Sequence, residues 1–289
     1  MGFTFHQPAS LEDAVRLGAR FGDEGRFIAG GTDLVIQINR KRLAPHHLVS
    51  LAGISGLSGI EVSERGAWIG ALTTLKTIER HALFRERLAM LGEAARVVGG
   101  HQVRNIATIG GNIVNASPAA DTVAPLLALD ATLDLVGEGD RRTVALADFL
   151  KGPGRTDRRP DEVLVGVRFP NVPEATGTAF IKAGRRRAME ISVVCVAVRL
   201  SRASSGAISE AAVALGAAAP TTLRCRQAEQ QLIGRQPEDV LFREAAATAA
   251  RESLPISDVR ASADYRRNLI ETLVERALHR CMATIGGPS

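Results

Sequence analysis

Two pairs of consecutive glycines are the features of this sequence that most restrict its fold. Gly30-Gly31 separates a strand predicted over residues 26–29 from an apolar run over 34–38, which is predicted to be helical, and Gly110-Gly111 lies between two further apolar segments. Glycine adopts backbone conformations closed to other residues, so such a pair can expose adjacent N–H groups as a concave anion-binding nest. Each pair is predicted either to hold a diphosphate in this way or to be only a tight turn.

The remaining pattern alternates strand and helix signals, which indicates an α/β or α+β protein. A capping box from Ser10 to Asp13 opens a helix that ends at Gly22. Further helices are expected over 75–98, as two segments, and over 119–129. Strands are expected over 60–62, 67–70, 133–136, 142–144, 163–169, 179–181, 192–200 and 208–215.

The composition predicts a folded chain of about two domains, and it argues against a nucleic-acid partner and a transmembrane segment. The chain has 289 residues, of which 45% are hydrophobic and 23% charged, and a segment rich in proline and glycine over 170–177 predicts the domain boundary. A net charge of +5 with only 4% aromatic residues argues against a nucleic-acid partner. The start of the chain lacks a signal-peptide pattern, and no window has about 18 consecutive apolar residues, so a cytoplasmic location without a transmembrane segment is expected.

No metal site and no catalytic residue is predicted. Cys195, Cys225 and Cys281 lack metal-ligand spacing and are predicted to be core residues. The sequence contains no serine triad order, no H-E-x-x-H helix, no G-x-G-x-x-G fingerprint and no P-loop. Arg104 is predicted either to contact an anion or to form a surface salt bridge. Asp121 is either a first-turn helix residue or a functional one.

The last helix has the clearest pattern in the chain. Apolar residues recur at spacings of three and four and are predicted to face the core: Leu269, Ile270, Leu273, Val274, Ala277, Leu278 and Cys281. Charged residues are expected on the opposite, solvent-exposed face: Arg266, Arg267, Glu271, Glu275 and Arg280.

Three motifs together give the sequence a family resemblance over nearly its whole length. They are Phe27–Leu34, Gln102–Asn105 leading into Ala107–Asn112, and Ser117–Asp121 with Pro125–Asp130, and the second half adds Phe180–Ala183 and Ala263–Arg267. With these motifs the chain resembles the FAD-binding medium subunit of the molybdenum hydroxylases, a group that includes aerobic carbon monoxide dehydrogenase and the flavin domain of xanthine dehydrogenase. The resemblance implies an α+β fold, with a two-lobed FAD-binding domain of the vanillyl-alcohol oxidase (PCMH) type over 1–173 and a smaller α+β domain of the CO dehydrogenase flavoprotein type over 174–289.

The resemblance also implies a set of FAD-binding residues. The first glycine loop would hold the diphosphate through main-chain amides: Ala29, Gly30, Gly31, Thr32, Asp33 and Leu34. A second segment would face the diphosphate and the flavin from the other side: Thr108, Ile109, Gly110, Gly111 and Asn112, with Val103 packing nearby. Asp121 would bind ribityl or ribose hydroxyls, and Leu164 or Val165 would touch the flavin ring. Asn115 and Ala120 complete the predicted set of FAD-binding residues.

Lys182 is expected at the pyrimidine end of the flavin, where a cation stabilises the negative charge of the reduced ring. The alternative is an ordinary surface lysine. No cysteine cluster lies between the glycine motifs and the linker, so the extra iron–sulfur cluster of the 4-hydroxybenzoyl-CoA reductase medium subunit is not expected.

The resemblance implies an electron-transfer role in a larger complex. A small subunit would carry [2Fe–2S] clusters and a large subunit the molybdopterin, in a dimer of heterotrimers. Electrons from these centres would reach FAD and then an external acceptor. The alternatives are a freestanding FAD-dependent reductase similar to UDP-N-acetylenolpyruvoylglucosamine reductase, and a nucleotide-binding protein without redox chemistry.

Overall fold

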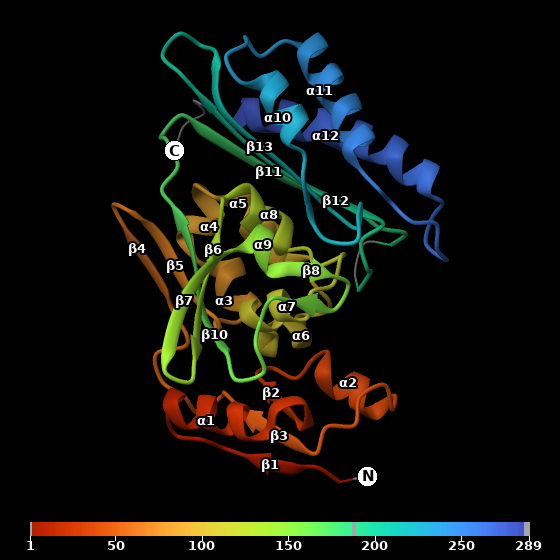
Figure 1. Ribbon diagram of the computed structural model, residues 1–289. Coiled ribbons are helices and arrows are strands. Elements are labelled where there is room, and N and C mark those ends of the chain that lie inside the picture. The colour runs from red at the N-terminus through yellow and green to blue at the C-terminus, as the bar shows by residue number, and fades with distance from the viewer. Residues whose placement is uncertain (1, 187–188, 286–289) are drawn as a thin grey trace.

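The computed structural model describes residues 2–186 and 189–285, and it mixes helices and strands throughout, as predicted. Figure 1 shows a small N-terminal lobe, a larger lobe with a second sheet and its helices, a third sheet above these helices, and a final helical layer. None of the helices in the described part of the chain combines the length and apolarity needed to cross a bilayer.

The N-terminal lobe is a parallel three-stranded sheet with two helices and a short 3-10 turn. Its strand order is β1 (Thr4–His6), β3 (His47–Ser50), β2 (Gly25–Ile28). Its helical elements are α1 (Leu11–Phe21), η1 (Gly22–Glu24) and α2 (Leu34–Asn39). The predicted cap of α1 is confirmed, because Ser10 Oγ accepts a hydrogen bond from the amide of Asp13 at 3.0 Å.

The second lobe is built on an antiparallel five-stranded sheet. Its order is β4 (Ile60–Ser63), β5 (Gly66–Gly70), β10 (Val163–Pro170), β6 (Thr132–Gly137), β7 (Asp140–Ala145). Both predicted hairpins and the predicted strand over 163–169 are confirmed. A separate hairpin pairs β8 (Leu150–Gly152) with β9 (Arg155–Thr156).

Short helices cover one face of this sheet. They are α3 (Leu75–Arg80), α4 (Ala82–Glu86), α5 (Ala89–Arg96), α6 (His101–Ile106), α7 (Ile109–Val114), α8 (Val123–Ala128) and α9 (Leu146–Phe149). The segment over 75–98 forms three helices instead of the predicted two. The helix predicted over 119–129 begins only at Val123, because turns occupy the residues between Ser117 and Thr122.

A third, antiparallel sheet and three helices complete the chain. The strand order is β11 (Thr176–Ala183), β12 (Val194–Arg202), β13 (Ile208–Gly216), β14 (Leu223–Arg224), and the helices are α10 (Arg226–Leu232), α11 (Asp239–Glu252) and α12 (Ala263–Thr284). Strands were predicted at the positions of β11, β12 and β13, and the structure confirms all three.

The third sheet is buried on both faces. Phe180, Cys195 and Ala197 pack into the core of the second lobe, whereas Val194, Val196 and Val198 pack against α10, α11 and α12. Strands covered on both sides lack the alternation of half-exposed strands, which explains the almost continuous apolar sequence of β12.

The predictions for α12 and for the cysteines hold with one exception. The predicted apolar stripe packs into the core, with Leu269 only partly buried. Arg266, predicted on the solvent face, is instead 1% exposed and lies in the interior. All three cysteines are buried as predicted, and burial raises the pKa of each thiol.

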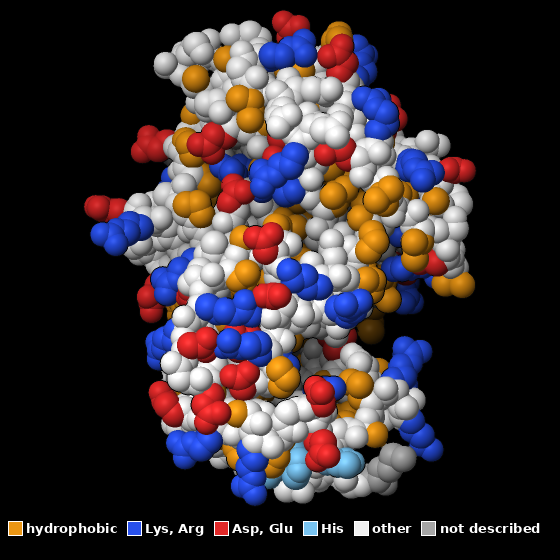
Figure 2. All heavy atoms as spheres, in the orientation of Figure 1, with side chains coloured by type: hydrophobic (Ala, Val, Ile, Leu, Met, Phe, Trp, Pro, Cys, Tyr) orange, Lys and Arg blue, Asp and Glu red, His pale blue; other side chains and the backbone are white. Residues whose placement is uncertain are grey.

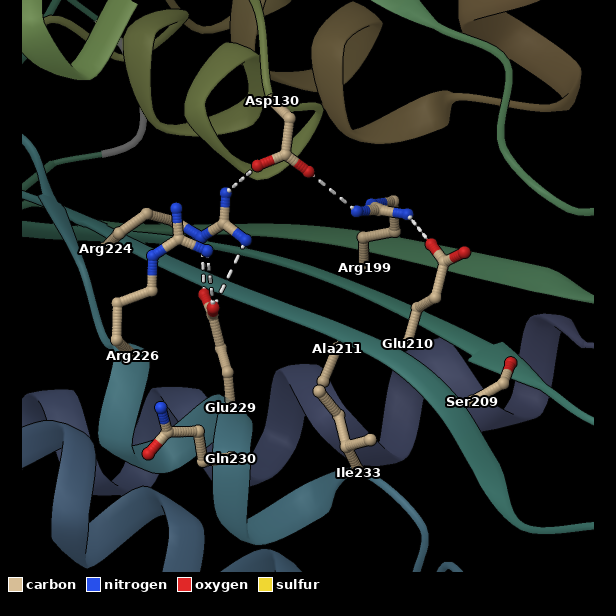
Figure 3. A pocket seen from close by; sticks show the side chains of 10 residues that line it. All are labelled: Asp130, Arg199, Ser209, Glu210, Ala211, Arg224, Arg226, Glu229, Gln230 and Ile233. Carbon is tan, nitrogen blue, oxygen red and sulfur yellow. Dashed lines mark hydrogen bonds and ion pairs between the residues drawn. The ribbon is translucent and has the colours of Figure 1, made fainter.

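A charged junction joins the end of α8 to the third sheet (Figure 3). Asp130 accepts hydrogen bonds from Arg199 Nη2 at 3.0 Å and from Arg224 Nη1 at 2.7 Å. The same arginines donate to the last carbonyls of α8, Arg199 to Ala128 and Arg224 to Leu127. The junction borders a recess of about 290 Å³. The ion pairs of Arg199 and Arg224 with Asp130 connect the second lobe to the third sheet.

Candidate cofactor-binding site

The first glycine loop exposes a row of unused backbone amides. In the part of the chain that the structure describes, no acceptor is bonded to the N–H groups of residues 30–34, whereas the next amide, that of Val35, donates to the Gly31 carbonyl at 3.0 Å. Gly31 has a φ of +69°, a left-handed conformation that favours glycine. Consecutive free amides at such a turn form an anion-binding concavity, so the loop fits a diphosphate.

Gly30 brings this loop into direct contact with the second motif. A Cβ atom at this position would lie 1.9 Å from the carbonyl oxygen of Ile106, so no side chain fits. Residues 30 and 106 are therefore neighbours, although 76 positions of sequence separate them. Figure 2 shows a hollow between the part of the molecule that carries α2 and the part that carries α6 and α7.

The second glycine pair does not expose its amides, so of the two alternatives for this pair the anion-binding nest is wrong. The amide of Gly110 donates to the Ala71 carbonyl at 2.8 Å, and that of Gly111 donates to Thr108 Oγ1 at 3.1 Å. Thr108 is the N-cap of α7, and the chain passes so close to Ala71 that a Cβ on Gly110 would lie 2.7 Å from the Cβ of Ala71. Glycine is required here for close packing.

Asp121 and Lys182 form a buried ion pair between the second lobe and the third sheet. Lys182 Nζ lies 2.6 Å from Asp121 Oδ2 and 3.3 Å from the carbonyl oxygen of Val97. The side chain of Lys182 is only 12% exposed, so it is not an ordinary surface lysine. Asp121 precedes α8 and points to this lysine, so its alternative role as a first-turn helix residue is also wrong.

Burial raises the pKa of the Asp121 carboxyl, although Lys182, Ser192 and Cys195 all act to lower it. Ser192 Oγ donates to Asp121 Oδ1 at 2.5 Å, and no signal in the sequence marked this serine. At the other end of the site, partial burial raises the pKa of Asp33 in the first glycine loop.

Other predicted site residues lie along a strip on α6 and α7, close to the ion pair. Asn112 Oδ1 accepts a hydrogen bond from Thr122 Oγ1 at 2.7 Å, which places α7 beside Asp121. Val103 packs against Gly99, close to the Val97 carbonyl that Lys182 contacts. Arg104 pairs with Glu79 at 3.1 Å and is largely buried, so it is held in a salt bridge and is not free for an anion.

The remaining predicted positions lie around this strip. The Val165 carbonyl accepts a hydrogen bond from Ala71, the residue on which Gly110 packs, and the Val165 side chain packs against the N-terminal lobe. Leu164 is buried in the main core. Asn115 ends α7, and Ala120 is buried next to Asp121.

Comparison with known proteins assigns both parts of the chain to described families. Residues 1–172 match the family of the FAD binding domain in molybdopterin dehydrogenase, and residues 179–281 match the CO dehydrogenase flavoprotein C-terminal domain. The xanthine dehydrogenase FAD-binding subunit of Escherichia coli O157:H7 is 35% identical over 287 residues, covering 98% of this chain and 97% of the relative.

Two further comparisons concern carbon monoxide dehydrogenase of Hydrogenophaga pseudoflava. Its medium chain is 32% identical over 281 residues, with 97% of each chain covered. A solved structure of that enzyme contains a chain that superposes with a TM-score of 0.95 at 32% identity, over 99% of each chain. The chain described here therefore belongs to the FAD-binding subunits of the molybdenum hydroxylase family, which includes those of carbon monoxide dehydrogenase and xanthine dehydrogenase.

Proposed function

We propose that this chain carries FAD in a multi-subunit molybdenum hydroxylase and transfers electrons from iron–sulfur clusters to an external acceptor. The observation that carries this proposal is the row of free amides in residues 30–34, held against the second motif by Gly30. A diphosphate satisfies such amides without any charged side chain.

Different site residues bind different parts of FAD in this proposal. The amides of the loop from Ala29 to Leu34 hold the diphosphate, and residues 108–112 face it from the other side. Because the amides of Gly110 and Gly111 are already bonded, this second segment contributes the open surface of Gly111 and the side chain of Asn112. Asp121 binds hydroxyls of the ribityl chain or the ribose, with Val103, Asn115, Ala120 and either Leu164 or Val165 nearby.

FAD, when bound, supplies the two-electron redox chemistry, and the chain positions it and tunes its charge. Lys182 does this tuning at the pyrimidine end of the ring. Its ammonium is held by Asp121 and largely withdrawn from water, so its field is weakly screened.

The domain organisation supports the same role. We propose that residues 1–173 form a two-lobed FAD-binding domain of the PCMH type, and that residues 174–289 form a second domain that delivers Lys182. A small iron–sulfur subunit and a large molybdopterin subunit are the proposed partners, in a dimer of heterotrimers. Two relatives are named as a subunit and a medium chain of dehydrogenases, which supports a place in a multi-subunit enzyme.

The visible spectrum of the native complex tests the proposal. We expect a flavin chromophore that stays with this chain when the subunits are separated, together with iron–sulfur absorption from a partner. A native complex without flavin would refute the proposal. Reduction of the flavin by NADPH in the isolated chain would instead indicate a freestanding reductase.

Replacing Lys182 with Met should lower the midpoint potential of the bound flavin. Loss of the ammonium removes the charge that favours the reduced ring, and a tenfold change in the ratio of reduced to oxidised affinity corresponds to about 30 mV for a two-electron couple. Dye-equilibrated reductive titration measures the shift. Lys76→Met is the matched control, because Lys76 is also a partly buried lysine, paired with Glu79 at 3.1 Å. An equal potential in both variants would contradict the role of Lys182.

A further inference from the structure

We propose that Ser192 is a positioning residue that keeps the Asp121 carboxylate ionised and directed at Lys182, and thereby sets the redox potential of the flavin. This inference rests on the proposed function, because it assumes that Lys182 lies beside the bound ring. Ser192 itself need not contact the cofactor.

In the described part of the chain, the two oxygens of the Asp121 carboxylate accept from two different side chains. Lys182 Nζ lies 2.6 Å from Oδ2, and Ser192 Oγ lies 2.5 Å from Oδ1. Asp121 is 5% exposed and Ser192 is fully buried, so water does not replace either bond easily. The serine therefore fixes the rotation of the carboxylate and leaves the other oxygen for the lysine.

The backbone holds Ser192 firmly in this position. The Ser192 carbonyl accepts a hydrogen bond from Arg260 Nη1 at 3.3 Å. The following residue, Val193, donates to the Ala183 carbonyl at 2.8 Å and accepts from the buried Arg266 at 2.6 Å. A hydroxyl supported in this way is preorganised to donate to the carboxylate.

Loss of the hydroxyl should change the charge at the site. A buried carboxylate with an unsatisfied oxygen is costly, and burial already raises the pKa of Asp121. Among the residues that the structure describes, the titratable groups that face this carboxylate are the Lys182 ammonium on β11 and the Cys195 thiol on β12, which is itself protonated because burial raises its pKa. Protonation of Asp121 would leave the ammonium of Lys182 uncompensated, which favours the reduced flavin.

Ser192→Ala should therefore raise the flavin midpoint potential. We expect the ratio of reduced to oxidised affinity to increase by about tenfold, which corresponds to about 30 mV. The matched control is Ser201→Ala, which removes another fully buried hydroxyl, one that lies on β12 and is bonded to Thr176 Oγ1 at 2.7 Å. A potential that moves equally in both variants, or in neither, would overturn the inference.

A double-mutant cycle separates this role from a general structural effect. Asp121→Asn should raise the potential by itself, and adding Ser192→Ala in that background should change it no further, because the serine acts through the carboxylate. Additive shifts would overturn the inference. The flavin content of the unsubstituted chain is measured first and tests the proposed function separately. A chain without FAD refutes the proposed function. An unshifted potential in a flavin-loaded Ser192→Ala variant refutes only the role of Ser192.

Discussion

Gly30→Ala should weaken FAD binding while leaving most of the fold in place. The new Cβ atom would lie 1.9 Å from the Ile106 carbonyl oxygen and 2.7 Å from its carbonyl carbon, and both belong to the backbone, which cannot rotate away. The loop must then move off the second motif, and overpacking of this kind costs about 1 to 3 kcal/mol. Because FAD binding needs the loop in its place against the second motif, this cost raises the FAD dissociation constant by roughly 5-fold to 150-fold. Fluorescence titration of the apoprotein with FAD measures it.

Two other glycine substitutions make this prediction specific. Gly31→Ala places a side chain at a φ of +69°, but its neighbours are flexible side-chain atoms of Ile28 and Val35 at 3.2 Å, so a smaller loss of affinity is expected. Gly53→Ala meets only the Pro8 carbonyl oxygen at 3.9 Å and should bind FAD normally. FAD affinity should therefore fall in the order Gly53→Ala, Gly31→Ala, Gly30→Ala. Any other order would show that binding does not require the close approach of the two motifs.

Arg266→Met should destabilise the chain far more than the same substitution at the exposed Arg267 of its helix. Arg266 donates to the carbonyls of Val193 and Ala217 at 2.6 and 3.1 Å and pairs with Asp258 at 2.7 Å, all from a side chain that is 1% exposed. Methionine fills much of the volume but leaves two buried carbonyls without this donor. Breaking a buried charged network in this way costs about 3 to 5 kcal/mol. Urea unfolding followed by circular dichroism measures the loss.

The neighbouring residue provides the control for this experiment. Arg267 is on the same helix and also pairs with an aspartate, Asp264 at 2.8 Å, but its side chain is 45% exposed and that of Asp264 is 90% exposed. Arg267→Met should therefore change the free energy of unfolding by no more than about 0.5 kcal/mol. Similar losses in the two variants would mean that the contacts of Arg266 contribute little to stability.

Features set by local sequence were predictable, and the third sheet illustrates this. The apolar runs of β12 and β13 and the three-and-four spacing of α12 reflect burial along a single element, which periodicity detects. The cap at Ser10 was also predictable, because donor and acceptor are three residues apart. The first glycine loop belongs to the same class, since its free amides follow from its own backbone.

Features that depend on distant partners were not predictable from a single sequence. Nothing near Gly110 indicates that its amide would bond to Ala71, and nothing near Asp121 marks Lys182 or Ser192, 61 and 71 positions away, as its partners. Arg266 looked like a solvent-facing residue because helical spacing alone does not reveal a loop that covers that face. The resemblance to a known family named Asp121 and Lys182 as site residues, but their mutual ion pair required coordinates.

The double burial of the third sheet has a consequence for how the protein is made. While a ribosome is still synthesising β11 to β13, the apolar surface of α5 and α8 has no cover, and it is completed only when these strands arrive. The strands in turn need α11 and α12, which follow them in the chain. These two layers are therefore expected to finish folding only after α12 has been synthesised, and a chain terminated before α12 would be a natural client for chaperones and proteases.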